Sequence, residues 1–172
     1  MTPMLLTIIA DDRPGIVEAV ADVISTHQGN WLESQLANLA GKFAGIVRIE
    51  LPEDQVTALS TALAELHSKG IKVSIDEGNQ RVQGGQARVK ITVTGSDRPG
   101  IVREITALLA RQQVNVLSMN TQCELAPMSN DHLFVATVQV VLPDSMDEHD
   151  LAETLEGIST DLMVDTDVLA KL

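Results

Sequence analysis

Apolar and polar residues alternate at the start of the second half of the chain. Val89, Ile91 and Val93 interleave there with polar and charged residues, which is the period of a strand with one face in a core and the other in water. The matching strand near the N-terminus carries Leu5 and Ile9 on its second face as well. We therefore expect that second face to pack against something.

Helical spacing follows each of these strands. Apolar residues recur at intervals of three and four, as one face of an amphipathic helix requires. Pro14 and Pro99 suit the first helical position, where no backbone N–H is needed. The apolar positions are Ile16, Val17, Val20, Val23 and Ile24 in the first segment, and Ile101, Val102, Ile105, Leu108 and Leu109 in the second.

Each half then predicts two more strands, a second helix and a last strand. We expect the second helices directly after Pro52 and Pro143. The order β-α-β-β-α-β predicts an α+β fold of two ferredoxin-like domains, each a four-stranded antiparallel sheet with two helices on one face. The further strands are expected at 31–39, 43–51 and 71–75, and at 116–122, 134–142 and 162–168.

The chain is an internal repeat. The hexapeptide Asp-Arg-Pro-Gly-Ile-Val stands at 12–17 and again at 97–102, an offset of 97 − 12 = 85 residues. Further along, Phe43 matches Phe134 with an offset of 134 − 43 = 91. The second copy therefore holds six extra residues, in the stretch around 123–132.

The repeat divides the chain into two small domains, expected at 1–78 and 87–172. Residues 79–86 between them are polar and rich in glycine, which is typical of a flexible linker. Aromatic residues make up only 2% of the chain. Aliphatic side chains and methionine must therefore build both cores.

The charge balance excludes one class of partner. The chain carries 24 Asp and Glu against 12 Lys and Arg, a formal net charge of −12. Nucleic acids are bound through clustered basic side chains, so we expect no direct contact with DNA or RNA. No apolar run approaches the roughly 20 residues that span a bilayer. We expect a cytoplasmic protein with no membrane contact, and the single Cys123 agrees with a reducing compartment.

Candidate chemistry gathers at the two strand-to-helix corners. The N-terminus of a helix attracts a carboxylate, glycine permits close approach, and aspartate suits an ammonium group. These are the parts of an amino-acid site, although a purely structural role for the aspartates at the helix start stays open. The candidate residues are Asp11, Asp12, Arg13, Pro14 and Gly15 with Asn30 in the first copy, and Ser96, Asp97, Arg98, Pro99 and Gly100 with Asn115 in the second.

Asn30 and Asn115 each begin the strand that follows the first helix. We expect that end of the strand to lie near the corner, where the amide either binds a ligand or forms the turn. Trp31 would close over a ligand there or pack beside the strand.

The remaining motifs are weaker. The four histidines and Cys123 lack the spacing of a metal site, and we expect neither a metal nor a cofactor. The acidic run 144–150 is typical of a solvated helix start, with recognition by a basic partner as the alternative. The apolar loop 125–128 either packs locally or contacts a partner. Nothing assembles a nucleophile, a base and an oxyanion site, so we expect no enzyme.

Each half resembles the ACT domain, a small regulatory module that binds amino acids in metabolic enzymes and regulators. The resemblance rests on the Asp-Arg-Pro-Gly-Ile-Val corner and the βαββαβ order, and it covers nearly the whole chain. A tandem of two such domains alone is similar to ACT-type repressors of the glycine cleavage system. The resemblance implies glycine as the ligand, a LysR-type transcriptional activator as the partner, amino-acid sites at interfaces between ACT domains, and a homo-oligomer.

Two other functions stay open. Formyltetrahydrofolate deformylase and enzymes of serine metabolism carry similar ACT domains, so the chain could be an accessory subunit that regulates a metabolic enzyme in trans. It could also be an interaction scaffold that binds no ligand. The identity of the partner distinguishes a repressor from an accessory subunit, because a repressor binds a LysR-type regulator and an accessory subunit binds an enzyme.

Overall fold

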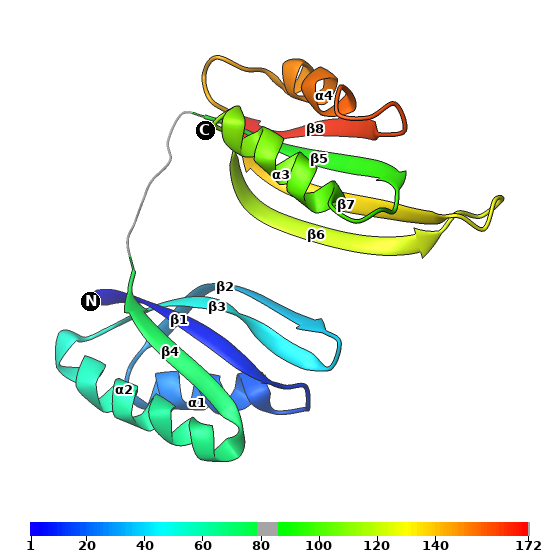
Figure 1. Ribbon diagram of the computed structural model, residues 1–172. Coiled ribbons are helices and arrows are strands. Elements are labelled where there is room, and N and C mark those ends of the chain that lie inside the picture. The colour runs from blue at the N-terminus through cyan, green and yellow to red at the C-terminus, as the bar shows by residue number, and fades with distance from the viewer. Residues whose placement is uncertain (79–85, 172) are drawn as a thin grey trace. The chain divides into compact units, whose positions relative to one another are not determined.

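The computed structural model describes residues 1–78 and 86–171. The chain divides into two units, Met1–Arg81 and Val82–Leu172, each with its own core. Each unit has the predicted order β-α-β-β-α-β (Figure 1). The expected linker, 79–86, lies outside the described residues except for Gln86.

The first unit is an antiparallel sheet with strand order β2-β3-β1-β4. Its second helix follows Pro52 directly, as predicted, with a 3-10 turn at each end of the α-helix. The elements are β1 (Thr2–Asp11), α1 (Ile16–Thr26), β2 (Asn30–Leu39), β3 (Lys42–Leu51), α2 (Val56–Glu65) and β4 (Ile71–Glu77), with 3-10 turns at Glu53–Gln55 and Leu66–Lys69.

The second unit repeats this topology, with strand order β6-β7-β5-β8. All three strand pairs are antiparallel. The elements are β5 (Ala87–Ser96), α3 (Ile101–Arg111), β6 (Asn115–Leu125), β7 (His132–Val141), α4 (Glu148–Glu156) and β8 (Met163–Lys171).

Helix α4 begins later than the sequence predicts. It starts at Glu148 rather than directly after Pro143. Asp147 and Asp150 form a capping box: the N–H of Asp150 donates to Oδ1 of Asp147 at 2.8 Å, and the N–H of Asp147 donates to Oδ2 of Asp150 at 3.2 Å. The acidic run therefore supplies the helix start predicted for it, because two side chains satisfy two otherwise unpaired donors.

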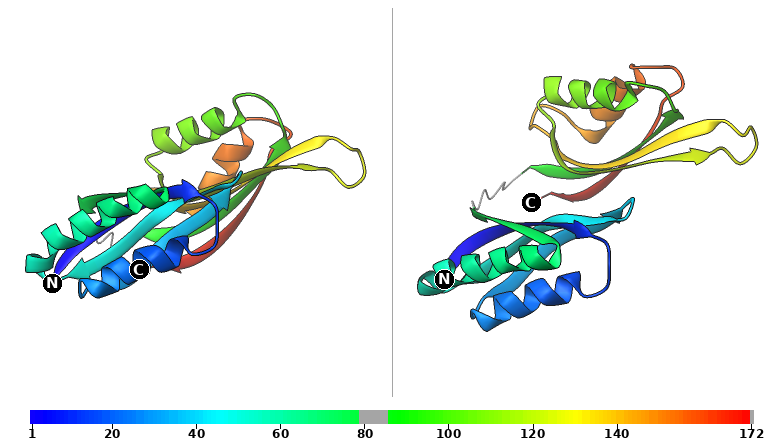
Figure 2. Two further views of the ribbon diagram at one scale, coloured as in Figure 1. Left: turned by 90° about the horizontal axis from the view of Figure 1, so that it is seen from below. Right: turned by 60° about the horizontal axis from the view of Figure 1, so that its bottom comes forward.

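Helices cover only one face of each sheet (Figures 1 and 2). Alternate residues of every central strand point to that face, and full burial of each Val, Leu or Ile contributes about 1.5–3 kcal/mol. The buried side chains of these layers include Leu6, Ile8, Val47, Ile49, Ile16, Val20 and Ile24 in the first unit, and Val89, Ile91, Val93, Val138, Ile101, Ile105 and Leu109 in the second.

The faces turned away from the helices differ between the two units. On the first sheet, Leu5 is half-buried while Ile9 and Ile46 on neighbouring strands are 46% and 42% exposed. The corresponding face of β5 carries Lys90 and Thr94. The second apolar face predicted for the N-terminal strand is therefore present on β1, while the equivalent positions of β5 are polar.

Gly45 marks a close approach of two strands in the first sheet. It lies on β3 opposite Leu36 of β2. A methyl group at Gly45 would stand 2.8 Å from the Cα of Leu36 and would overlap the carbonyl oxygen of Gln35. The equivalent residue of the second sheet, Ala136, is fully buried without such a conflict.

We expect Gly45→Ala to lower the free energy of unfolding by about 2–3 kcal/mol, because β2 must move to admit the methyl group. Ala136→Gly is the matched control, and its loss should stay near about 1 kcal/mol. Urea unfolding followed by circular dichroism measures both values. Equal losses in the two variants would show that β2 and β3 are not packed as closely as the structure has them.

Candidate functional site

Both strand-to-helix corners depend on a glycine in the left-handed region. Gly15 has φ +90° and Gly100 has φ +89°, and each is the N-cap residue of its helix. These angles match the third position of a type II turn, whose second position favours proline. Pro14 and Pro99 therefore lie in this turn and not at the first helical position, because the left-handed glycine separates them from the helix.

The beginning of each helix presents unpaired donors at the corner. The first turns close with the N–H of Ala19 donating to O of Gly15 and the N–H of Glu104 donating to O of Gly100, each at 3.0 Å. The preceding N–H groups have no acceptor within the helix, and of these the N–H of Ile101 makes a long hydrogen bond to O of Arg98, at 3.4 Å. They add to the positive potential of the helix N-terminus, which favours a carboxylate.

The two aspartates of the corners do not cap the helices. Asp12 and Asp97 are exposed, and neither helix has a side-chain cap at its N-terminus. Their backbone N–H groups instead donate to O of Gly41 and O of His132, both at 2.9 Å. Neither carboxylate therefore caps its helix: backbone hydrogen bonds hold the turn, and both side chains are exposed.

The equivalent arginines of the two corners have different partners. The guanidinium of Arg13 donates to the carbonyl of Lys69 at the end of the 3-10 turn. Arg98 instead forms two hydrogen bonds to the carboxylate of Glu104 on α3, at 2.8 and 2.6 Å. This hydrogen-bonded ion pair lowers the pKa of Glu104 below its ordinary value. Ala19 stands at the equivalent place in the first copy, so only the second corner has this pair.

The residue before each hexapeptide is also held in place. Asp11 pairs with Lys42 across the sheet, and the hydrogen bond from the ammonium group lowers the pKa of Asp11. At the second corner the N–H of Ser96 donates to Oδ2 of Asp161 at 3.2 Å. A hydrogen bond from Ser159, and next the one from Ser96, lower the pKa of Asp161.

The expected proximity of the asparagines to the corners is wrong. Asn30 pairs with Glu50 on β3, and Glu50 pairs with Pro3 at the start of β1. The corner follows Asp11, eight residues further along β1, which is about 27 Å at about 3.4 Å per residue. The helix between β1 and β2 runs antiparallel to both strands and returns the chain to the opposite end of the sheet. Asn115 has the same place in the second sheet, where it pairs with Val141.

Trp31 lies at that same distant end and packs against the core of the first unit. The interpretation of Trp31 as a packing residue is therefore confirmed. Its neighbour Asn30 donates weakly from Nδ2 to Oε1 of Glu50, at 3.4 Å. Neither side chain reaches the corner of its own domain.

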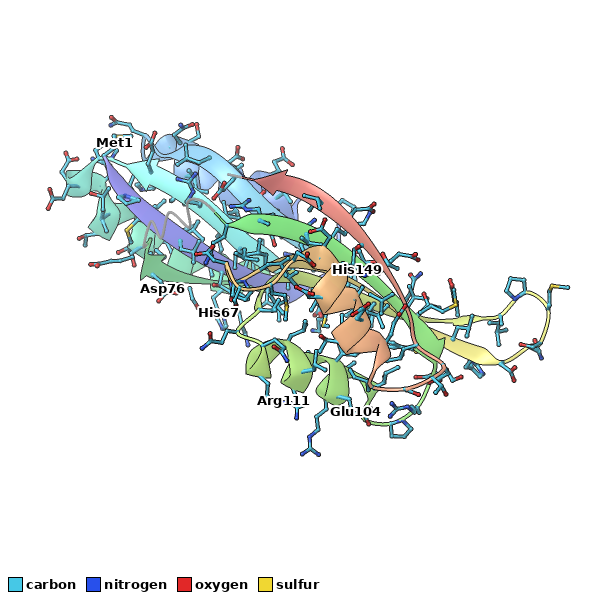
Figure 3. All side chains as sticks on the ribbon, turned by 90° about the horizontal axis from the view of Figure 1, so that it is seen from above. Met1, His67, Asp76, Glu104, Arg111 and His149 are labelled. Atoms are coloured by element: carbon cyan, nitrogen blue, oxygen red, sulfur yellow. The ribbon has the colours of Figure 1, made fainter. Side chains whose placement is uncertain are left out.

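An open groove of about 850 Å³ begins beside the second corner and runs between α3 and α4. Ala107, Leu108 and Ile158 give it an apolar lining. Arg103 and Arg111 stand on its α3 side and Glu153 on its α4 side, and Figure 3 shows Glu104 and Arg111 toward opposite ends of α3. In the first unit, by contrast, α1 and α2 contact each other.

The model of the ACT domain matches residues 2–76 and again residues 88–168. The chain belongs to the ACT-domain family. Its two units are ACT domain 1 and ACT domain 2, and the predicted α+β fold of two ferredoxin-like domains is confirmed.

Relatives match the tandem as a whole. The glycine cleavage system transcriptional repressor of Escherichia coli strain K12 is 22% identical over 166 residues, which cover 92% of this chain and 85% of the relative. A crystal structure of a protein described as unknown, from Galdieria sulphuraria, has a TM-score of 0.79 at 23% identity and covers 98% of this chain and 99% of its own. A crystal structure named for a candidate glycine cleavage system transcriptional repressor has a TM-score of 0.71 at 19% identity and covers 98% and 97%.

Three further residues lie near the corner of ACT domain 2: Glu104, Asp161 and Cys123. Asp161 and Cys123 are far from the hexapeptide in sequence, so only the fold brings them there, while Glu104 follows the hexapeptide on α3 and is marked only by its pairing with Arg98. Partial desolvation, and then the nearby carboxylate of Asp97, raise the pKa of the exposed Cys123 thiol. The six-residue difference between the copies, which begins at Cys123, was the one signal pointing to that strand.

Within residues 1–78 and 86–171, no helix is long and apolar enough to cross a membrane. No group of three or more His, Cys, Asp or Glu side chains in the same residues is arranged to hold a metal ion.

We expect Gly100→Ala to destabilise ACT domain 2 by about 1–2 kcal/mol. A methyl group at Gly100 would meet no atom within 4 Å, so the loss comes only from the left-handed backbone conformation. Gly100→Asn is the matched control and should lose less, because asparagine tolerates this region better. Chemical unfolding measures both, and an alanine variant as stable as wild type would contradict the corner geometry.

The ion pair between Arg98 and Glu104 predicts a pH-dependent contribution to stability. Because the pKa of Glu104 is lowered in the folded state, the contribution is present at neutral pH and is lost as pH falls through that lowered value. Glu104→Gln should therefore be less stable than wild type at pH 7, and the difference should shrink as pH falls toward 3. Arg98→Gln should follow the same curve, and a constant difference from pH 7 to pH 3 would contradict this assignment.

Proposed function

We propose that this protein is an amino-acid-responsive transcriptional regulator, a repressor of the glycine cleavage system that acts through a DNA-binding activator of the LysR type. The family and the similarity to the Escherichia coli repressor along 92% of the chain support this proposal. In this function the chain binds its ligand and its partner in the cytoplasm and catalyses no reaction.

One observation carries the ligand part of the proposal. The same corner occurs twice, with a left-handed glycine, an exposed aspartate and the free N–H groups of a helix N-terminus. The helix N-terminus suits the carboxylate of an amino acid, and Asp12 or Asp97 suits its ammonium group. Glycine fits best, because an amino acid without a side chain needs no further pocket. The neighbouring Asp11, Arg13 and Ser96, Arg98 hold the corners in shape.

The partner part of the proposal rests on charge. A protein with a net charge of −12 is repelled by the phosphates of DNA. A regulator of this composition therefore needs a basic, DNA-binding partner through which to reach a promoter. The same charge favours association with such a partner.

The positions of the asparagines suggest how a site is completed. One ACT domain cannot place its corner and its asparagine on the same amino acid, because they lie at opposite ends of the sheet. An ACT domain of a second chain, running antiparallel to the first, would bring its Asn30 or Asn115 to the corner. A homo-oligomer is therefore part of the proposal, and the accessible apolar residues Ile9 and Ile46 offer a surface for it.

Isothermal titration calorimetry against glycine tests the ligand site, with serine and alanine as comparison ligands. We expect saturable binding of glycine, weakened by about tenfold or more in Asp12→Asn or Asp97→Asn, since a hydrogen bond to a charged group contributes about 1.5–3 kcal/mol. Asp76→Asn, at the opposite end of the first sheet, is the control and should bind like wild type.

Two results would contradict the assignment. If both corner variants keep their fold and bind glycine as wild type does, the site lies elsewhere. If the wild-type chain binds none of the three amino acids, the function as an amino-acid sensor is wrong, and the interaction scaffold becomes the better explanation. A pull-down that returns a metabolic enzyme instead of a LysR-type activator would favour the accessory subunit.

A further inference from the structure

The hairpin between β6 and β7 is longer than its counterpart in ACT domain 1. The first hairpin closes at the pair Leu39 and Lys42, with two residues between them. The second continues to the pair Leu125 and His132, with residues 126–131 as its loop. The hairpin projects past the neighbouring strands of its own sheet in both figures (Figures 1 and 2). The six extra residues therefore build a projection that the fold itself does not require.

The tip of this hairpin is apolar and held open. Met128 is 99% exposed and Leu125 is 55% exposed, so the expectation of local packing is wrong for both. The loop is fixed by hydrogen bonds from the N–H of Ala126 to O of Asp131 at 2.8 Å and from the N–H of Asn130 to O of Ala126 at 3.3 Å. Large apolar side chains kept in water on an ordered loop are typical of a contact surface.

Carboxylates flank the tip. Glu124 and Asp131 are exposed, and neither forms an ion pair with any residue in 1–78 or 86–171. Gln122 makes only a long hydrogen bond to Glu124, at 3.5 Å. A surface that receives this tip should therefore offer an apolar floor with basic side chains beside it.

The groove between α3 and α4 has these properties. Its floor is formed by Ala107, Leu108 and Ile158. Arg103 and Arg111 flank the floor about 12 Å apart, at about 1.5 Å per residue along α3. Both are exposed, and neither has an ion-pair partner among the residues that the structure describes.

The other charged groups around the groove are already engaged. Glu104 is bound by Arg98. Glu153 on the α4 side lies 3.3 Å from Nε2 of His149. An acidic segment would therefore lie along the α3 side, where the two free guanidinium groups stand, and away from Glu153.

We infer that the hairpin tip of one chain docks into the α3–α4 groove of a second copy. Met128 and Leu125 would cover the apolar floor, and Glu124 and Asp131 would pair with Arg103 and Arg111. The hairpin cannot fill the groove of its own domain, because the loop is held away from the helices with Met128 in solvent. Hairpin and groove belong to the same domain, so two chains can exchange their hairpins reciprocally about a two-fold axis and form a closed dimer.

Disulfide trapping in the full-length chain tests this contact directly. In a Cys123→Ser background, a tagged Met128→Cys chain is mixed with an untagged Ala107→Cys chain under mild oxidation. We expect a mixed covalent dimer in about tenfold higher yield than with Asp22→Cys, the exposed residue of α1 equivalent to Ala107, because docking raises the local thiol concentration. A yield equal to that of the Asp22→Cys control would overturn the inference.

Charge reversal provides the second test. Arg103→Glu with Arg111→Glu, or Glu124→Arg with Asp131→Arg, should each reduce the yield of mixed dimer by about tenfold, and the two pairs combined should restore it. Yields that do not change on reversal would overturn the inference even if the chain is dimeric.

A shortened hairpin gives an independent readout of assembly. Replacing residues 125–132 by Ala-Gly copies the turn at Ala40 and Gly41 of ACT domain 1, whose φ angles of +50° and +79° suit a two-residue hairpin. In the Cys123→Ser background, the shortened chain should self-associate about tenfold more weakly than the chain with the full hairpin, as sedimentation velocity measures. Equal self-association of the two chains would overturn the inference. A heat-unfolding midpoint close to wild type confirms that the shortened chain is folded. Glycine binding is measured separately, so failure of this inference leaves the proposed ligand site intact.

Discussion

Two helices cover one face of each sheet and leave the other face bare. This one-sided burial determines which side chains lie in the core and which lie on the surface. A central strand must bury alternate residues such as Leu6 and Ile8, and the residues between them face away from the core. Those outer positions are then free to differ between the copies. They are apolar around Ile9 and Ile46 in ACT domain 1 and polar around Lys90 in ACT domain 2.

The sequence predicted the parts of the fold that depend on periodicity and repetition. Alternation found the central strands, helical spacing found α1 and α3, and the repeated hexapeptide found both corners. It failed where the outcome depended on direction or competition in three dimensions. Asn30 lies at the far end of the sheet because the intervening helix runs back along the strands, and α4 begins late because the capping box at Asp147 outweighs the proline signal of Pro143. The ion pair between Arg98 and Glu104 depends on the direction of both side chains, so the sequence pattern alone does not predict it.

The two copies have diverged most on their helix layers. α1 and α2 contact each other in the first copy, while a groove lies between α3 and α4 in the second. The position of Arg103 is held by Glu18 in the first copy, so the same helix face has opposite charge in the two domains. The two domains therefore keep similar cores and the same fold, while their surfaces differ and suit different binding partners.

A backbone hydrogen bond joins each corner to the hairpin beside it. The N–H of Asp97 donates to the carbonyl of His132, the residue at which β7 begins. Anything that immobilises the corner therefore also immobilises the base of the long hairpin, and the reverse holds equally. By thermodynamic linkage, two binding events at these places would alter each other's affinity by the same factor. Asp12 and Gly41 form the same hydrogen bond in ACT domain 1, but the hairpin there ends in a two-residue turn and has no projecting tip to which the bond could couple the corner.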